Sequence, residues 1–139
     1  MSVIVLLGIL EGKVLMQLRT ERPDIVFPGH WGFFSGSIEE GEMPHEAAVR
    51  ELQEELGLTL PLTPLGDVIV PDLDDLHAHL FGFYLSKMPD ALYEGEDMVL
   101  VGLSDIDRKV MHSRRLDRTF PFVPSPFIRE TIEKALSWR

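Results

Sequence analysis

The chain has 139 residues, of which 45% are hydrophobic and 26% are charged, and its formal net charge is −10. This balance is typical of one globular domain, so we expect residues 1–139 to form a single unit. The absence of cysteine excludes disulfides and thiolate chemistry. The first apolar run, Val3 to Leu10, is too short to span a membrane and follows no basic segment, so we expect a cytoplasmic protein without a membrane partner.

Strand and helix patterns alternate along the chain. The first two apolar segments are joined by Glu11-Gly12 and predict a β-hairpin, and Ser125-Pro126 is typical of a helix start. Strands that come first, with one helix inside the chain and one at its end, favour an α/β fold with a mixed sheet between helices. We predict strands at 3–10, 14–19, 31–34, 65–70, 76–85 and 98–103, helices within 36–58 and after residue 125, and a short turn at 105–107 capped by Ser104.

Residues 36–58, GSIEEGEMPHEAAVRELQEELGL, carry the strongest functional signal. Glu51, Glu54 and Glu55 are spaced i, i+3 and i+4, which places them on one face of a helix. Carboxylates this close repel one another unless a cation lies among them. A hard divalent ion such as Mg²⁺ is suitable because it takes oxygen ligands.

The helix that carries these acids has well-marked ends and an apolar side. Pro44 suits its first turn, and Gly57 follows where a left-handed residue is favoured at the C-terminus. We expect the helix to pack on a core through its apolar side and to leave the carboxylates exposed. The apolar side consists of Ala48, Val49, Leu52 and Leu56.

The same segment resembles the Nudix box, G-x5-E-x7-R-E-U-x-E-E-x-G-U, in which U is a bulky aliphatic residue. The resemblance implies an α/β/α sandwich with a mixed β-sheet between helices. It also implies a metal-dependent hydrolase that uses Mg²⁺ or Mn²⁺. The matching residues are Gly36, Glu42, Arg50, Glu51, Leu52, Glu54, Glu55, Gly57 and Leu58.

The resemblance also implies roles for single residues. Glu51, Glu54 and Glu55 correspond to metal ligands, joined by the backbone carbonyl of Gly36. One box carboxylate would serve as general base, Glu54 in preference to Glu51. Arg50 would complete the catalytic group by orienting the ligand carboxylates. Its partner in this role would be Glu42, with which it would form a structural ion pair.

Two segments outside the box are candidates for further site residues. Family members often place one more carboxylate on the site from a loop, and here Glu96 or Glu94 would supply it; the alternative is a solvated acidic turn. Residues 108–118 hold five bases, and Arg114 and Arg115 would grip phosphates from a cationic rim. The alternative is a flexible surface loop that offsets the acidic charge. Arg19, at the end of a predicted strand, matches a phosphate-binding base in the family.

His77 and His79 alternate with apolar residues on a predicted strand and therefore point to one face. Two such histidines can bind Zn²⁺ when a third ligand is present, and the sequence does not identify one. The alternative is a pair that lines a pocket or a solvent face.

These observations predict a pyrophosphohydrolase that cleaves a nucleoside diphosphate linked to another group. A nucleotide sugar, ADP-ribose and a non-canonical nucleoside triphosphate remain open as substrates. The alternative is a non-catalytic nucleotide sensor with the same fold, whereas an isopentenyl diphosphate isomerase is excluded by the lack of cysteine. The partner is thus a small-molecule nucleotide, and the negative net charge argues against nucleic acid. The family resemblance makes a homodimer an expectation.

Overall fold

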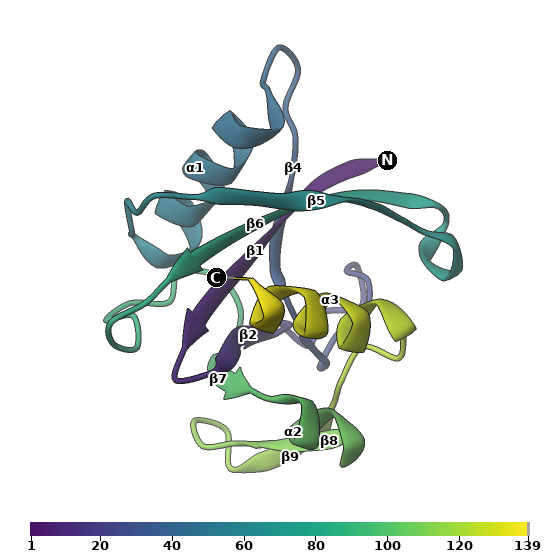
Figure 1. The fold of residues 1–139 in the computed structure, drawn as a ribbon. Helices are drawn as coiled ribbons and strands as arrows, with labels where there is room; N and C mark the ends of the chain where they lie inside the picture. The colour runs from purple at the N-terminus through teal and green to yellow at the C-terminus, as the bar shows by residue number, and fades with distance from the viewer. Residues whose placement is uncertain (139) are drawn as a thin grey trace.

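The computed structural model describes residues 1–138. A mixed seven-stranded sheet lies between two helices, with α1 (Pro44–Leu56) on one face and α3 (Pro126–Ser137) on the other (Figure 1). The predicted α/β class and the α/β/α arrangement are therefore confirmed. The sheet contains β1 (Ser2–Leu10), β2 (Lys13–Leu18), β3 (Trp31–Gly32), β4 (Phe34–Ser37), β5 (Thr63–Val70), β6 (Leu76–Tyr84) and β7 (Asp97–Val101).

The central strand β1 changes partners along its length. It pairs in parallel with β6 from Ser2 to Ile9 on one side. On the other side its first half pairs with β4, and its last residues, Ile9 and Leu10, pair with β2 in the predicted hairpin. The strand is apolar on both faces, as a central strand between two helical layers requires. Its alternating side chains separate cleanly, with Ile4 and Leu6 in the α1 layer and Val5 and Leu7 in the α3 layer.

Helix α1 has the predicted ends but a different buried side. Pro44 is its first residue, and Gly57 follows it with a left-handed φ of 67°. Val49 is 41% exposed, so its assignment to the apolar side is wrong. The expectation that the carboxylates stay exposed is also wrong for two of the three. The buried side runs as a continuous stripe of Ala47, Ala48, Glu51, Leu52, Glu55 and Leu56.

Two further predictions need correction, and one is confirmed. The predicted strand at 31–34 is two strands, because the chain changes partner at Phe33 from β2 to β1. The turn at 105–107 belongs to helix α2 (Leu103–Asp107), which is capped by Gly102 and not by Ser104. At the last helix, Ser125 Oγ accepts a hydrogen bond from the Phe127 backbone N–H at 3.2 Å, which confirms the predicted start of α3.

The basic segment is a β-hairpin, β8 (Val110–Ser113) and β9 (Arg118–Pro121), rather than a flexible loop. A short 3₁₀ turn, η1 (Pro71–Leu73), joins β5 and β6. Within residues 1–138, no helix has the length and apolar character needed to cross a membrane.

Candidate functional site

Three carboxylates from two segments gather beside β4. Glu51 and Glu55 come from α1, and Glu94 comes from the loop between β6 and β7. One oxygen from each lies within 4.8 Å of the others. The structure therefore brings together two of the three predicted box ligands and adds a third from outside the box.

Glu55 is the most unusual member of this cluster. Its side chain is fully buried, and neither carboxylate oxygen has a hydrogen-bond partner. Burial raises the pKa of Glu55 to about 10, helped by the negative charges of Glu94 and Glu51. A buried carboxylate without a partner is costly unless a cation or a proton balances it. The all-oxygen donor set fits a hard divalent cation.

Gly36 on β4 makes room for Glu51. A Cβ atom at position 36 would lie 2.2 Å from the Glu51 carboxyl carbon. Burial raises the pKa of Glu51, opposed by hydrogen bonding to Arg50. The requirement for glycine at this box position is therefore steric, whereas coordination by its carbonyl stays a prediction.

Replacing Gly36 by alanine should displace the Glu51 carboxylate and leave the fold intact. The atoms that a methyl group would meet belong to the Glu51 side chain, which can swing away. We expect divalent-metal affinity to fall at least about 10-fold, measured by calorimetry. Gly102→Ala is the matched control, because its nearest atom outside the adjoining residues is 3.6 Å from the added Cβ. Unchanged metal affinity in Gly36→Ala would remove Glu51 from the site.

Arg50 holds the acidic helix to the loop before it. Its Nε and Nη2 donate to the two oxygens of Glu42 at 2.7 and 2.9 Å, and Nη2 also donates to the Ser37 carbonyl at 3.0 Å. Its Nη1 donates to Glu51 Oε1 at 2.8 Å. Hydrogen bonding to Arg50 lowers the pKa of Glu42 to about 2. The predicted Arg50–Glu42 pair is present, and the same guanidinium positions Glu51.

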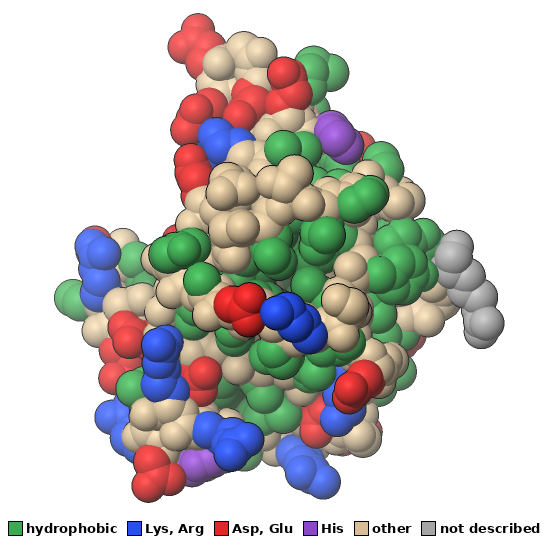
Figure 2. All heavy atoms as spheres, turned by 90° about the vertical axis from the view of Figure 1, so that its left-hand side faces the viewer, with side chains coloured by type: hydrophobic (Ala, Val, Ile, Leu, Met, Phe, Trp, Pro, Cys, Tyr) green, Lys and Arg blue, Asp and Glu red, His purple; other side chains and the backbone are tan. Residues whose placement is uncertain are grey.

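Acidic side chains gather over the projecting β4–α1 loop and the start of α1 (Figure 2).

Arg50→Ala should weaken metal binding and turnover by about 10- to 100-fold, because Glu51 loses the group that orients it. Arg129→Ala provides the control, since Arg129 lies on α3 and pairs with Asp107 and Glu133. Metal titration and steady-state rates should be measured on both variants. Equal behaviour of the two would show that the Arg50 network has no part in the site.

Glu54 lies apart from the three-carboxylate cluster. Its side chain is 58% exposed, and it accepts a hydrogen bond from Arg50 Nη1 at 3.3 Å. The side chain is thus free to meet a ligand that approaches from solvent. Its predicted roles as metal ligand and general base stay predictions.

The loop after β6 presents Glu94, not Glu96, to the cluster. Gly95 between them has a φ of +89° and packs against Gln17 and the Leu18 carbonyl of β2. Next along the chain, the Glu96 backbone N–H donates to that carbonyl at 2.8 Å. This turn fixes which acid faces α1. The sequence indicated an acidic turn as a source of a further carboxylate, but no spacing rule distinguished Glu94 from Glu96.

Arg19 is partly buried and lines a cavity. Burial lowers its pKa, opposed by the negative charges of Glu94 and Glu55. Its Nε donates to the Val26 carbonyl at 2.6 Å, and the side chain lines a cavity of about 700 Å³ on the α3 side of the sheet. Ser35, the neighbour of Gly36, lines the same cavity. The other lining residues include Val5, Val26, Phe27, Phe33, Phe127, Asp72 and Asp74.

Arg114 and Arg115 lie in the exposed turn of the β8–β9 hairpin. Arg115 donates to the Glu96 carbonyl at 3.3 Å. Neither arginine lines the cavity. The structure therefore does not place these two predicted phosphate-binding residues at the cavity, whereas it does place Arg19 there.

An α/β/α sandwich with an acidic cluster at one helix, beside a cavity lined by a partly buried arginine, places the chain in a class of small α/β domains. The NUDIX domain family model matches residues 1–111, and the chain belongs to this family.

Individual proteins also match the chain in sequence or in fold. The 8-oxo-dGTP diphosphatase of Proteus vulgaris is 35% identical over 74 residues, which cover 53% of this chain and 66% of that protein. An octanoyltransferase of Myxococcus xanthus is 33% identical over 133 residues, which cover 90% of this chain and 32% of that protein. The chain thus spans two thirds or less of these relatives. The MutT protein of Methanosarcina mazei Go1 has the same fold, with a TM-score of 0.69 at 22% identity, over 96% of this chain and 90% of that one.

Proposed function

We propose that the protein is a metal-dependent pyrophosphohydrolase that cleaves the diphosphate of a nucleoside diphosphate linked to another group. The observation that carries the proposal is the neighbourhood of the carboxylate cluster and a largely apolar cavity: Arg19 and Ser35 line the cavity, and Gly36, next to Ser35, lies against the Glu51 carboxylate. A nucleotide has the matching parts, because its base is apolar and flat and its phosphates are anionic. One bound molecule could therefore reach both regions.

Glu51, Glu55 and Glu94 would hold the cation, Mg²⁺ or Mn²⁺, with Glu54 and the Gly36 carbonyl completing the ligand set. The cation would supply charge neutralisation for the phosphate oxygens and acidify a bound water. Arg19 would bind a phosphate, and the base would enter the cavity between Phe27 and Phe127.

Glu54 would take a proton from the attacking water. The water oxygen would join one phosphorus while the bond from that phosphorus to the bridging oxygen breaks. The bridging oxygen would leave with the second phosphate. The protein would act mainly by position and electrostatics, as in other phosphoryl transfers.

A substrate panel tests this proposal. The 8-oxo-dGTP diphosphatase relative favours a non-canonical nucleoside triphosphate, so this class should be compared with nucleotide sugars and ADP-ribose at fixed Mg²⁺. Products should be identified by chromatography, with and without chelator. Chelator-sensitive cleavage of one class supports the enzyme. Tight nucleotide binding without cleavage of any class would establish the sensor instead.

A further inference from the structure

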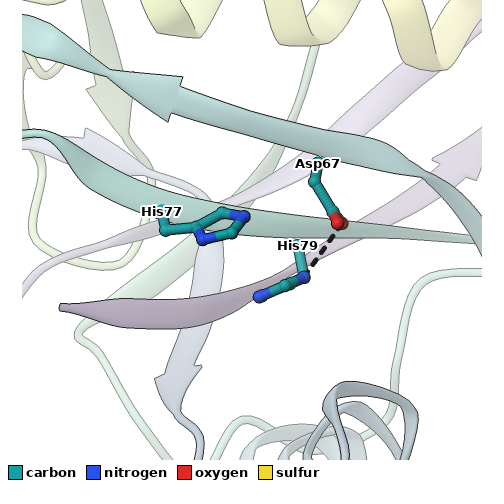
Figure 3. A group of neighbouring side chains, drawn as sticks. All are labelled: Asp67, His77 and His79. Atoms are coloured by element: carbon teal, nitrogen blue, oxygen red, sulfur yellow. Dashed lines mark hydrogen bonds and ion pairs between the residues drawn. The ribbon is translucent and has the colours of Figure 1, made fainter.

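Two histidines and one aspartate gather on β5 and β6, outside the carboxylate cluster (Figure 3). His77 and His79 share the β6 face that also carries Phe81, which packs in the α1 layer. Their rings stack with centroids 4.5 Å apart and planes at 26°. Asp67 on β5 is the cross-strand partner of His79, and its Oδ1 lies 2.9 Å from His79 Nδ1. One ligand atom from each of the three lies within 4.8 Å of the others.

We infer that Asp67, His77 and His79 form a binding site for a borderline divalent transition metal of the Zn²⁺ class. The sequence places the two histidines on one face, and β5 contributes the third ligand that the sequence could not identify. Two imidazoles and one carboxylate form a donor set that suits Zn²⁺, with a fourth position left for water or another ligand.

The geometry needs little adjustment to accept the ion. Bonds of about 2.0–2.2 Å in a tetrahedral site separate the ligand atoms by about 3.3–3.5 Å. Asp67 Oδ1 and His79 Nδ1 are already 2.9 Å apart. Small side-chain rotations would therefore let a metal ion replace the hydrogen-bonding proton between these two atoms. All three residues lie on paired strands, which hold their backbones in place better than loops do.

The site is open to solvent on one side, and further acids follow it in the turn between β5 and β6. The Asp67 side chain is 59% exposed and that of His79 is 15% exposed, so an ion can enter from the Asp67 side. The turn between β5 and β6 adds further exposed acids, which draw cations towards this end of the sheet. These acids are Asp72, Asp74 and Asp75.

This site is separate from the carboxylate cluster. Ile4 on β1 pairs with Gly36 of β4 on one side and with His79 of β6 on the other. Two strand spacings separate Gly36 from His79, which is about 10 Å. The donor sets also differ, since Mg²⁺ prefers oxygen ligands and imidazole favours Zn²⁺. Excess Mg²⁺ should therefore occupy the carboxylates and leave the histidines free.

The test is a calorimetric titration of metal-stripped protein with Zn²⁺ in the presence of excess Mg²⁺. The wild type should bind one Zn²⁺ per chain at this site. His77→Ala and His79→Ala should each lower the Zn²⁺ affinity at least about 10-fold. Losing a metal ligand should cost no less affinity than losing a residue that only hydrogen-bonds to a ligand. Asp67→Asn should also lower the Zn²⁺ affinity while leaving the metal-free melting temperature near that of the wild type. His112→Ala is the matched control, since His112 pairs with Asp117 at 3.2 Å on the surface without a second histidine.

Histidine ring resonances in a ¹H–¹⁵N spectrum give a second readout that does not depend on activity. Of the five histidines, only His77 and His79 should shift when Zn²⁺ is added. The inference is overturned if Zn²⁺ does not bind in excess Mg²⁺. It is equally overturned if binding survives both histidine substitutions, or if the ring resonances that move belong to other histidines. None of these outcomes depends on which nucleotide the protein cleaves.

Discussion

Without divalent metal, the protein should become less stable as the pH rises from about 5 to about 9. The folded chain holds a proton on Glu55, whose pKa is raised by burial from 4.5 to about 10, and the unfolded chain loses this proton near pH 4.5. This contribution to stability is fully present below pH 4.5 and is lost as the pH rises towards 10. For one such proton, the free energy of unfolding falls by up to about 1.4 kcal/mol for each unit by which the pH rises.

Glu55→Gln should remove most of this pH dependence, because glutamine resembles the protonated carboxyl and does not titrate. Melting curves in chelator should nearly coincide at pH 5, and the wild type should melt at a lower temperature at pH 9. Glu130→Gln, an exposed change of the same kind on α3, should follow the wild type.

Adding Mg²⁺ should restore the wild-type stability, with a larger gain at higher pH, because the cation replaces the proton. The Glu55→Gln variant should gain much less. A wild-type melting curve that responds to neither pH nor metal would rule out the buried carboxylate as part of a cation site.

Glu54→Gln should reduce kcat by at least about 10²-fold on the best substrate of the panel, the usual scale for a positioned acid–base group. Glutamine keeps the shape of the side chain and can still accept the hydrogen bond from Arg50. KM should change less, because Glu51 and Glu55 still hold the cation and Arg19 still binds a phosphate.

The control for this substitution is Glu133→Gln. Glu133 stands four residues after Arg129 on α3, as Glu54 stands four after Arg50, with closest N–O distances of 3.8 and 3.3 Å. It should retain full activity. Wild-type kcat in Glu54→Gln would exclude Glu54 as the base and direct attention to Glu94.

Helix α1 could be predicted almost completely because its local signals agree. Pro44, the acidic spacing and Gly57 define where it starts, which residues share a face and where it stops. Its orientation could not be predicted, because periodicity alone treats Val49 and Ala47 as equal candidates for burial. Packing against β1 and β4 decides that Ala47 is buried and that Val49 is exposed.

The parts that sequence reasoning missed depend on contacts between distant segments. The β8–β9 hairpin is rich in charge and lacks an apolar alternation, and it is held by the bond from Ser113 Oγ to Asp97 Oδ2 at 2.7 Å. Glu94 faces the cluster because its loop is held on both sides, by Gly95 against β2 and by the Tyr93 backbone N–H, which donates to the Glu55 carbonyl at 2.9 Å. Asp67 meets His79 only through the pairing of β5 with β6. Such partners are set by sheet register, which local patterns do not determine.

The Arg50 network explains why the length of the box should resist insertion and deletion. Arg50 reaches back to the Ser37 carbonyl and to both oxygens of Glu42 while it also holds Glu51. One residue added to α1 before Arg50 would turn the guanidinium by about 100° about the helix axis. The guanidinium would then point away from Glu42, even if every residue of the box kept its type. Frame-preserving insertions should therefore be selected against between Glu42 and Arg50.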